Sequence, residues 1–453
     1  MPGIAARTPS REAPVVRPVE TSRAVAIRAL LRIEDGAFAN VALPALLREA
    51  KLDARDRAQV TEWVYGTVRW QRTLDHFLTP FVDRRIAKLD PPVRVALRLG
   101  TYQLWSAIAA HAAVGETVTA MNAVSPRAKG YVNAVLRKLA ANGPPWPLPE
   151  DDTVESMAIR ASMPDWLVAL LVGDLGTADA EAVLAAVNEP GVVTLRVNPL
   201  RAAPADVEHE LLAEEISVTR GELVADSLLV TGSGDLSALG AITEGRVTPE
   251  DQASQAVATL VGAKPGERIL EIGAAPGGKT TAIAEAMGDE GLVVGVDRHA
   301  GRTQMIGDTA RRLGLTTAAP LVADGMNLPF RDASFDRVLV DAPCSGLGVL
   351  RRRPEARWRL QPENIDELAK LQITLMGSAA RLVCPGGRLV YSVCTLTAAE
   401  TIAIDEWART ALAEFVAVDP PGAPWIPLGR GARLLPGAAD TDGMYLLILQ
   451  APG

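Results

Sequence analysis

The chain has 453 residues and a mass of 47.9 kDa, a length that suggests about three domains. Hydrophobic residues make up 48% and charged residues 22%, so the composition is that of a globular protein with a large core. Three cysteines are too few for a disulfide framework, and no apolar run reaches the ~18 residues of a membrane helix. These features exclude a secreted disulfide scaffold and a membrane protein, and we expect a cytoplasmic protein.

The charge is distributed unevenly along the chain. The formal net charge of −8, taken alone, argues against a nucleic-acid partner. Residues 1–145, however, carry 21 basic and 12 acidic side chains, a net of +9, whereas residues 146–250 carry 5 and 19, a net of −14. Residues 251–453 have a net of −3. A basic N-terminal module therefore precedes an acidic one, and the basic module is the candidate nucleic-acid reader.

The first two modules differ in predicted secondary structure. Residues 1–20 mix Arg, Pro and Ala without an apolar core, and we expect a disordered tail. Residues 21–145 show apolar side chains at helical spacing, which predicts an all-helical domain that a Pro-rich segment at 143–147 ends. Residues 146–250 combine helical stretches with β-rich runs, which predicts a small α+β module. The first predicted helix begins at Thr21, the others lie at 56–70, 91–109, 114–122, 129–141, 153–173 and 178–187, and the β-rich runs lie at 192–197 and 222–230.

Residues 251–453 alternate between strands and helices. That rhythm predicts a doubly wound, mainly parallel α/β sheet, in which ligands bind beyond the carboxyl ends of the strands. The predicted strands span 268–273, 292–296, 321–323, 337–340, 387–393 and 444–450, and the predicted helices span 278–287, 301–313, 363–382 and 398–412.

A glycine-rich loop follows the first of these strands. Small residues let the backbone turn sharply and let a ligand approach the N-terminus of the next helix. The string also matches the P-loop pattern G-x-x-x-x-G-K-T, with Lys279 as the phosphate lysine, so a P-loop NTPase is one hypothesis. The loop consists of Gly273, Ala274, Ala275, Pro276, Gly277, Gly278 and Lys279.

Two acidic residues favour a different ligand. Asp297 ends the second strand, 24 residues after Gly273, where a carboxylate can accept both hydroxyls of a ribose. Asp324 ends the third strand and can accept a hydrogen bond from an adenine amino group. Carboxylates repel a nucleoside triphosphate, whereas S-adenosylmethionine carries a sulfonium and no phosphate. The sequence therefore favours S-adenosylmethionine as the cofactor, with helix capping as the alternative role of both acids.

Two of the three cysteines fall at the ligand edge of the predicted sheet. Cys344 lies just past the fourth strand and Cys394 at the end of the next, so neighbouring strands would bring both thiols to one pocket. Cys384 precedes its strand and should lie at the opposite edge. Two thiols without a nearby pair of histidines are too few ligands for a metal ion, and we expect no metal site.

Two thiols beside a methyl donor favour methylation of a pyrimidine. Carbon 5 of a pyrimidine is a poor nucleophile until a thiolate adds to carbon 6. Asp341, at the end of the fourth strand, is placed to contact ring nitrogen 3 and to offset charge as the adduct forms. The proton on carbon 5 must then leave and the enzyme thiolate must be eliminated, a release that a second cysteine could assist.

Several segments resemble the NOL/NOP/Sun family of RNA cytosine-5 methyltransferases. In the last module these are the loop at 274–280, Asp341-Ala342-Pro343-Cys344-Ser345-Gly346 and Tyr391-Ser392-Val393-Cys394-Thr395. Residues 249–255 resemble the segment that leads into that family's catalytic domain, and residues 21–145 resemble the NusB-type RNA-binding domain fused to its RsmB/Sun members. The resemblance implies an all-α NusB-like domain (21–145), a small α+β linker module (146–250) and a class I, Rossmann-like methyltransferase domain (251–453).

The resemblance also implies roles for the candidate site residues. Cys394 would be the nucleophile and Cys344 the residue that releases the product. The substrate would be a cytosine in 16S ribosomal RNA. The residues that would bind S-adenosylmethionine are Gly273, Ala274, Ala275, Pro276, Gly277, Gly278, Lys279, Asp297, Asp324 and Asp341.

The chain departs from the family pattern at three positions. Gly273 stands where the family usually has Cys, which creates the P-loop match and should not harm donor binding. Val393 stands where Thr is usual, so binding of the base is altered if that hydroxyl positions it. Met444 stands where Phe is common.

A basic cluster follows Cys344 in the sequence. Arg351, Arg352 and Arg353, with Trp358, are expected to contact RNA phosphates and to stack on a base, against the alternative of a solvated charged turn. We expect RNA as the partner, no membrane contact and a monomeric protein. A transfer RNA cytosine-5 methyltransferase and a non-catalytic antitermination-type RNA-binding factor are the remaining alternatives.

Overall fold

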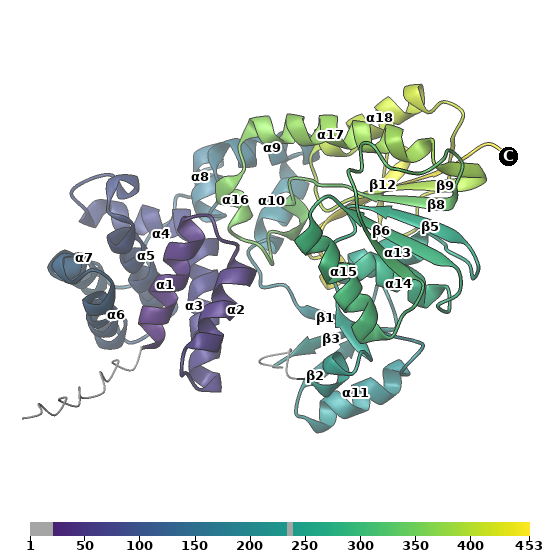
Figure 1. Ribbon diagram of the computed structural model, residues 1–453. Helices are drawn as coiled ribbons and strands as arrows, with labels where there is room; N and C mark the ends of the chain where they lie inside the picture. Colours follow the sequence, from purple (N-terminus) through teal and green to yellow (C-terminus); the bar gives the residue numbers. More distant parts are fainter. Residues whose placement is uncertain (1–20, 233–238) are drawn as a thin grey trace, which may run out of the picture. The chain divides into compact units, whose positions relative to one another are not determined.

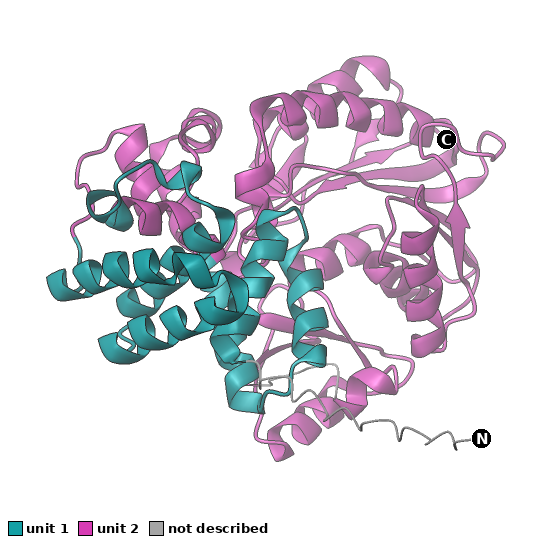
Figure 2. Ribbon diagram, turned by 60° about the vertical axis from the view of Figure 1, so that its left-hand side comes forward, with its two compact units in different colours: residues 1–67, 77–146 teal, residues 68–76, 147–453 magenta. Residues whose placement is uncertain are grey.

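The computed structural model describes residues 21–232 and 239–453. The chain divides into two compact units, drawn in teal and magenta in Figure 2. The first unit comprises the described residues up to Thr67 and the segment Phe77–Trp146, and the second comprises Val68–His76 and Pro147–Gly453. The tail predicted for residues 1–20 lies outside the described residues.

The described residues of the first unit form helices joined by loops, with no strand among them. Thr21 begins the first helix, because its hydroxyl accepts a hydrogen bond from the backbone N–H of Ala24. Close packing explains a glycine in the third helix, since a Cβ at Gly66 would lie 2.1 Å from the ring of Tyr102. Two helices, at 39–49 and 71–78, were not predicted. The helices that lie wholly or partly in this unit are α1 (Ser22–Glu34), α2 (Ala39–Glu49), α3 (Ala54–Arg69), α4 (Gln71–Leu78), α5 (Pro91–Trp105), α6 (Ala110–Val124) and α7 (Lys129–Asn142).

The segment that follows has a helical part and a sheet part. The helix predicted at 153–173 is interrupted, because Ser162 has a φ of 52° and Pro164 cannot continue a helix. The helical part contains α8 (Val154–Arg160), α9 (Asp165–Leu175) and α10 (Thr177–Ala186). The sheet part has the antiparallel order β2-β3-β1-β4, with β1 (Val193–Val197), β2 (Ser217–Arg220), β3 (Ser227–Thr231), β4 (Val247–Pro249), α11 (Pro204–Ala213) and α12 (Gly240–Thr243).

The remainder of the second unit is a doubly wound sheet with helices on both faces (Figure 1). Alternate residues of the strands face opposite ways: Leu270 packs in the core beneath α17 and α18, and Ile269 in the core beneath α13, α14 and α15. The parallel strands are β5 (Arg268–Ile272), β6 (Leu292–Asp297), β7 (Ala318–Val322), β8 (Phe335–Asp341) and β9 (Val383–Val393). The helices are α13 (Gln252–Leu260), α14 (Gly278–Ala286), α15 (Ala300–Leu313), α17 (Pro362–Ala380) and α18 (Ile402–Ala411).

The strand order fixes where a ligand can bind. The sheet runs β11-β12-β13-β9-β8-β5-β6-β7, so the chain proceeds from β5 to β6 and β7 on one side and then crosses to β8 and β9 on the other. The carboxyl ends of β5 and β8 therefore flank the topological switch point, where doubly wound sheets bind ligands.

The far side of the sheet is antiparallel. The predicted last strand is β13 (Met444–Gln450), which pairs antiparallel with β9. The short strands β10 (Val416–Ala417), β11 (Ile426–Leu428) and β12 (Gly431–Leu434) extend this side and were not predicted. Over the described ranges, no helix has the length and apolar character needed to cross a membrane.

Candidate active site

The glycine-rich loop joins β5 to α14 at the switch point. Gly273 has a φ of +83° and Gly277 a φ of +103°, a backbone region that side chains rarely adopt. A Cβ at Gly273 would lie 2.2 Å from the carbonyl oxygen of Asp341, the last residue of β8. The loop after β5 and the end of β8 are thus in direct contact, which only a glycine at position 273 permits with this backbone.

Lys279 is paired with a carboxylate. Its Nζ lies 2.8 Å from Oδ2 of Asp341, and both side chains are largely buried. The charge of Asp341 helps to raise the pKa of Lys279 above its ordinary value, against the opposing effect of burial. A lysine that neutralises Asp341 in this way is not presented to a phosphate group as a P-loop lysine is.

The two other predicted acids lie at or just beyond strand ends on this edge. Asp297, at the end of β6, accepts a hydrogen bond from the backbone N–H of His299 (2.9 Å) and pairs with Arg302 (3.2 Å). Asp324, beyond β7, is exposed and accepts from the backbone N–H of Met326 (3.0 Å). Both acids therefore make the local backbone contacts of capping residues, and each carboxylate retains lone pairs for a ligand.

The chemistry of these groups fits S-adenosylmethionine. Asp341 ends β8 and Asp297 ends β6, the two strands that flank β5, and Asp324 follows β7. The one lysine among the predicted residues is already paired with Asp341. Carboxylates accept hydrogen bonds from ribose hydroxyls and from ammonium groups and tolerate a sulfonium, whereas they repel a triphosphate.

The two predicted thiols meet. β8 and β9 are parallel neighbours with Asp341 opposite Ser392, and Sγ of Cys344 lies 3.3 Å from Sγ of Cys394. Cys384 lies near the other end of β9, where its thiol contacts the carbonyl oxygen of Ala333. Cys344 and Cys394 are thus brought together at the ligand edge, and Cys384 is not.

The two thiols have different environments. The hydrogen bond with Cys394 raises the pKa of Cys344 well above its ordinary value, as expected where Cys344 is the donor, and burial and the carboxylate of Glu400 add to this rise. Accepting that hydrogen bond lowers the pKa of Cys394, and the cations Lys279 and Arg353 act in the same direction, against burial and Asp341. The pair therefore favours a thiolate at Cys394 beside a protonated Cys344.

Sequence reasoning missed three buried charged residues close to the site. Glu271 lies in β5 beside Thr280, and burial raises the pKa of Glu271 to about 8. Glu400 ends the short 3-10 turn η6 (Ala398–Glu400) and lies behind the two thiols. Arg196 of β1 donates to the carbonyl oxygen of Gly278 (2.7 Å). For Glu271 and Arg196 the usable signal was a single charge inside an apolar strand. For Glu400 it was the capping pattern Thr-x-x-Glu.

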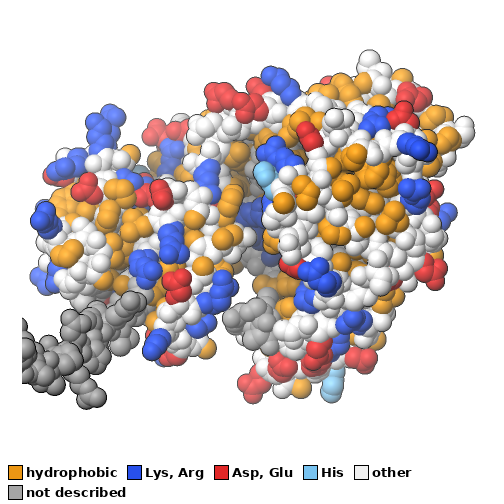
Figure 3. Space-filling model, viewed as in Figure 1, with side chains coloured by type: hydrophobic (Ala, Val, Ile, Leu, Met, Phe, Trp, Pro, Cys, Tyr) orange, Lys and Arg blue, Asp and Glu red, His pale blue; other side chains and the backbone are white. Residues whose placement is uncertain are grey.

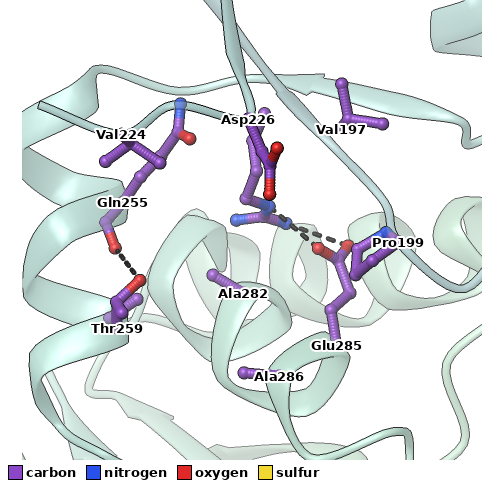
Figure 4. A pocket seen from close by; sticks show the side chains of 11 residues that line it. Val197, Pro199, Val224, Asp226, Gln255, Thr259, Ala282, Glu285 and Ala286 are labelled. Carbon is purple, nitrogen blue, oxygen red and sulfur yellow. Dashed lines mark hydrogen bonds and ion pairs between the residues drawn. The ribbon is translucent and has the colours of Figure 1, made fainter. Parts of the chain in front are cut away.

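Arg196 also borders a cavity away from the thiols (Figure 4). The cavity lies between the sheet part of the middle segment and helices α13 and α14, and the Arg196 guanidinium pairs with the Glu285 carboxylate at 3.0–3.1 Å. Glu250 pairs with the same guanidinium. None of the predicted donor-binding or catalytic residues lines this cavity.

The basic cluster after Cys344 is less exposed than predicted. Arg351 is 4% exposed and donates to the carbonyl oxygen of Thr441 (3.1 Å). Arg352 bridges Asp251 and Asp442, each at 2.8 Å. The indole N–H of Trp358 donates to the carbonyl oxygen of Val68 (2.8 Å).

Arg353 is the exposed residue of this triplet. The structure thus corrects the expectation of a uniform RNA-binding triplet, because two of its guanidinium groups are held by protein acceptors. On the face shown in Figure 3, Lys and Arg side chains of the helical unit are scattered among acidic ones rather than gathered in one continuous patch.

Comparisons with known proteins agree along the chain. Residues 258–450 match the family described as 16S rRNA methyltransferase RsmB/F, residues 20–141 match the NusB family, and residues 163–237 match the ferredoxin-like domain of RsmF/B-like methyltransferases. The chain is 33% identical to a probable ribosomal RNA small subunit methyltransferase B of Bacillus subtilis, over 95% of this chain and 99% of that one. It is 37% identical to the ribosomal RNA small subunit methyltransferase B of Thermus thermophilus, over 84% and 85%. The crystal structure of PH0851 superposes with a TM-score of 0.84 at 28% identity and covers 96% of this chain and 99% of that one.

Proposed function

The chain belongs to the 16S rRNA methyltransferase RsmB/F family, and on this premise we propose that it methylates carbon 5 of a cytosine in small-subunit ribosomal RNA. The observation that carries the proposal is the contact between Cys344 and Cys394, 3.3 Å apart beside the loop at the switch point. Neither a P-loop NTPase nor a non-catalytic antitermination factor, the two rival classes, requires a pair of thiols there, and family membership makes both interpretations wrong.

S-adenosylmethionine is the methyl donor, and it supplies an electrophilic methyl group to carbon 5. The loop from Gly273 to Lys279 would hold it, together with Asp297 and Asp324. Asp297 would accept from the ribose hydroxyls and Asp324 from the adenine amino group. The ion pair between Lys279 and Asp341 joins the donor loop to the end of β8, three residues before Cys344, so that Asp341 belongs to both halves of the proposed site.

Cys394 is the proposed nucleophile. Its thiolate adds to carbon 6 of cytosine, which moves electron density onto carbon 5 and makes that carbon able to accept the methyl group. Asp341 is placed to contact ring nitrogen 3 and to stabilise the adduct there. The lowered pKa of Cys394 increases the thiolate fraction at neutral pH and so favours this addition.

Cys344 is the proposed release residue. Loss of the carbon 5 proton to solvent returns an electron pair to the ring, and the bond between Sγ of Cys394 and carbon 6 breaks. The leaving group is a thiolate, and the protonated thiol of Cys344 stabilises it by donating a hydrogen bond across 3.3 Å. Without this donor the elimination slows and the covalent adduct persists.

For RNA contact, Arg353 replaces the full triplet as the proposed phosphate ligand beside the thiols. The NusB-type unit is proposed to bind the same RNA. The cytoplasmic location and the monomeric state stay predictions.

The experiment compares purified wild type with two single variants on small-subunit ribosomal RNA and on transfer RNA, using labelled S-adenosylmethionine and bisulfite mapping. We expect one 5-methylcytosine in the ribosomal RNA with wild type, and neither product nor adduct with Cys394→Ala. Cys344→Ala should accumulate an RNA–protein adduct that survives a denaturing gel. If adducts form only with Cys394→Ala, Cys344 is the nucleophile and Cys394 the release residue. Methylation of transfer RNA alone would overturn the proposed substrate.

A further inference from the structure

A single buried carboxylate lies directly behind the two thiols. Glu400 is fully buried, and five hydrogen-bond donors converge on its two oxygens. Oε1 accepts from the backbone N–H of Ser345 (2.9 Å) and from Nε2 of Gln372 (3.0 Å). Oε2 accepts from the hydroxyls of Ser345 (2.5 Å), Thr395 (3.1 Å) and Thr397 (2.9 Å). A carboxylate is the side chain that can accept so many bonds without offering a donor of its own.

The partners of Glu400 are the chain neighbours of the thiols. Ser345 follows Cys344 and Thr395 follows Cys394, and their hydroxyls are 2.6 Å apart. Gln372 also donates to the carbonyl oxygen of Pro343 (2.9 Å), the residue before Cys344. The carboxylate of Glu400 therefore bonds directly to the residue that follows each thiol, Ser345 after Cys344 and Thr395 after Cys394.

The strand ladder alone does not place the loop that carries Cys344. The register of β8 and β9 ends with Asp341 opposite Ser392, and the next backbone bond joins the N–H of Ala342 to the carbonyl oxygen of Ser392 (3.1 Å). Four residues after Cys344, the N–H of Gly348 donates to the carbonyl oxygen of Cys394 (3.0 Å). Between these two backbone bonds, Ser345, the residue after Cys344, is joined to the other loop through the side chains of Glu400 and Thr395.

We propose that Glu400 is a positioning residue that sets the separation and the mutual orientation of the Cys344 and Cys394 thiols. The catalytic consequence rests on the proposed function, because only a reaction that uses both thiols depends on their separation. The geometric claim does not rest on it and can be measured without RNA.

The separation of the thiols can be measured by oxidation with diamide, which takes up the two thiol hydrogens as the sulfurs form a disulfide. In wild type we expect rapid formation of a Cys344–Cys394 disulfide, mapped by peptide mass, because the two sulfurs are already in contact. In Glu400→Ala the rate should fall on the order of tenfold, because the sulfurs are no longer held at contact distance. Single-turnover methyl transfer should fall about 100-fold, the cost of a misplacement of about 1 Å. The KM for S-adenosylmethionine should not change, since the donor loop makes none of these bonds.

Asp405→Ala is the matched control for lost stability. Asp405 is an equally buried carboxylate five residues along, but its bonds run to Arg430. This variant should lose thermal stability and keep the wild-type rate of thiol oxidation. Glu400→Gln should retain most of that rate, because hydroxyl donors can rotate to accept from an amide nitrogen.

If Glu400→Ala does not fold, Thr395→Val and Ser345→Ala each remove a bond to the carboxylate and should slow oxidation by smaller factors. Wild-type oxidation and methylation rates in folded Glu400→Ala, or in both hydroxyl variants, would overturn the proposal. If wild type methylates no RNA while its thiol oxidation still depends on Glu400, the proposed function fails and the positioning role stands.

Discussion

Glu271 makes the stability of the large sheet depend on pH in a predictable direction. Its carboxyl group is 1% exposed in β5, and burial, reinforced by the charge of Asp341, raises the pKa of Glu271 from 4.5 to about 8. Between these two values the folded protein holds a proton that the unfolded chain has released. The free energy of unfolding therefore falls as pH rises, by about 1.4 kcal/mol per pH unit. The effect is absent below pH 4.5 and complete above pH 8, for a total of about 5 kcal/mol.

Glu271→Gln removes this titration and keeps the shape of the side chain. The free energy of unfolding of the variant, relative to wild type, should rise by about 2–3 kcal/mol between pH 5.5 and pH 7.5. The assay is urea unfolding at both pH values. Hydrogen exchange of the β5 peptide is the readout, because it reports unfolding of the sheet that contains Glu271.

Glu267→Gln is the control for this prediction. The pKa of Glu267 is lowered below its ordinary value, since its contacts with Arg337 and with the backbone N–H of Lys264 outweigh its burial. That carboxyl is ionised in both states above pH 5.5, so its replacement should change stability by the same amount at the two pH values. An equal difference at the two pH values for Glu271→Gln would refute the reasoning, because Glu271 would then be ionised in the fold.

Three further predictions concern the loop and the arginines. Gly273→Cys, which introduces the residue usual in the family, should lower stability by about 2 kcal/mol in urea unfolding and weaken binding of S-adenosylmethionine in calorimetry, because φ is +83° and the new Cβ meets the carbonyl oxygen of Asp341. Arg352→Ala should lower stability by about 3 kcal/mol in the same unfolding assay, since it leaves the buried carboxylate of Asp442 uncompensated. Arg353→Ala should leave stability unchanged and reduce the salt dependence of RNA binding by about one counterion in a filter-binding series. The first prediction is contradicted if Gly273→Cys leaves the affinity for S-adenosylmethionine unchanged. The second is contradicted if Arg352→Ala leaves the unfolding curve unchanged, and the third if Arg353→Ala leaves the salt slope of RNA binding unchanged.

The arrangement of the thiols could be predicted because it depends on chain order. Alternation of strand and helix fixes a parallel sheet, and a parallel sheet collects the ends of its strands at one edge, which places Cys344, Cys394 and Asp297 without knowledge of any contact. The fates of Arg351 and Arg352 could not be predicted in this way. A run of arginines predicts a charged, solvated turn. Arg351 and Arg352 instead donate to Thr441 and Asp442, about 90 positions along the chain, and only the tertiary fold brings these residues together.

The buried acids illustrate the same limit. The sequence shows that Glu271 interrupts an apolar strand, but its pKa depends on Asp341 and on burial by neighbours from other strands. The pattern Thr397-x-x-Glu400 indicates a helix start, and it does start one, since the Thr397 hydroxyl accepts from the N–H of Glu400. That the same carboxylate also receives Ser345 and Thr395 is a property of the tertiary fold alone.

The segment predicted as one linker module supports the site in two separate ways. Its helical part, α8 to α10, shares a hydrophobic core with Leu347, Leu350 and Leu396, which follow the two thiols within a few residues. Its sheet part sends Arg196 to the carbonyl oxygen of Gly278, at the start of α14 after the donor loop. The helices therefore support the loops that carry the proposed nucleophile and the proposed release residue, and the sheet supports the loop proposed to hold the donor. Because each half of the proposed site has its own buried support, the segment between the NusB-type unit and the methyltransferase sheet is a structural part of that site rather than a spacer.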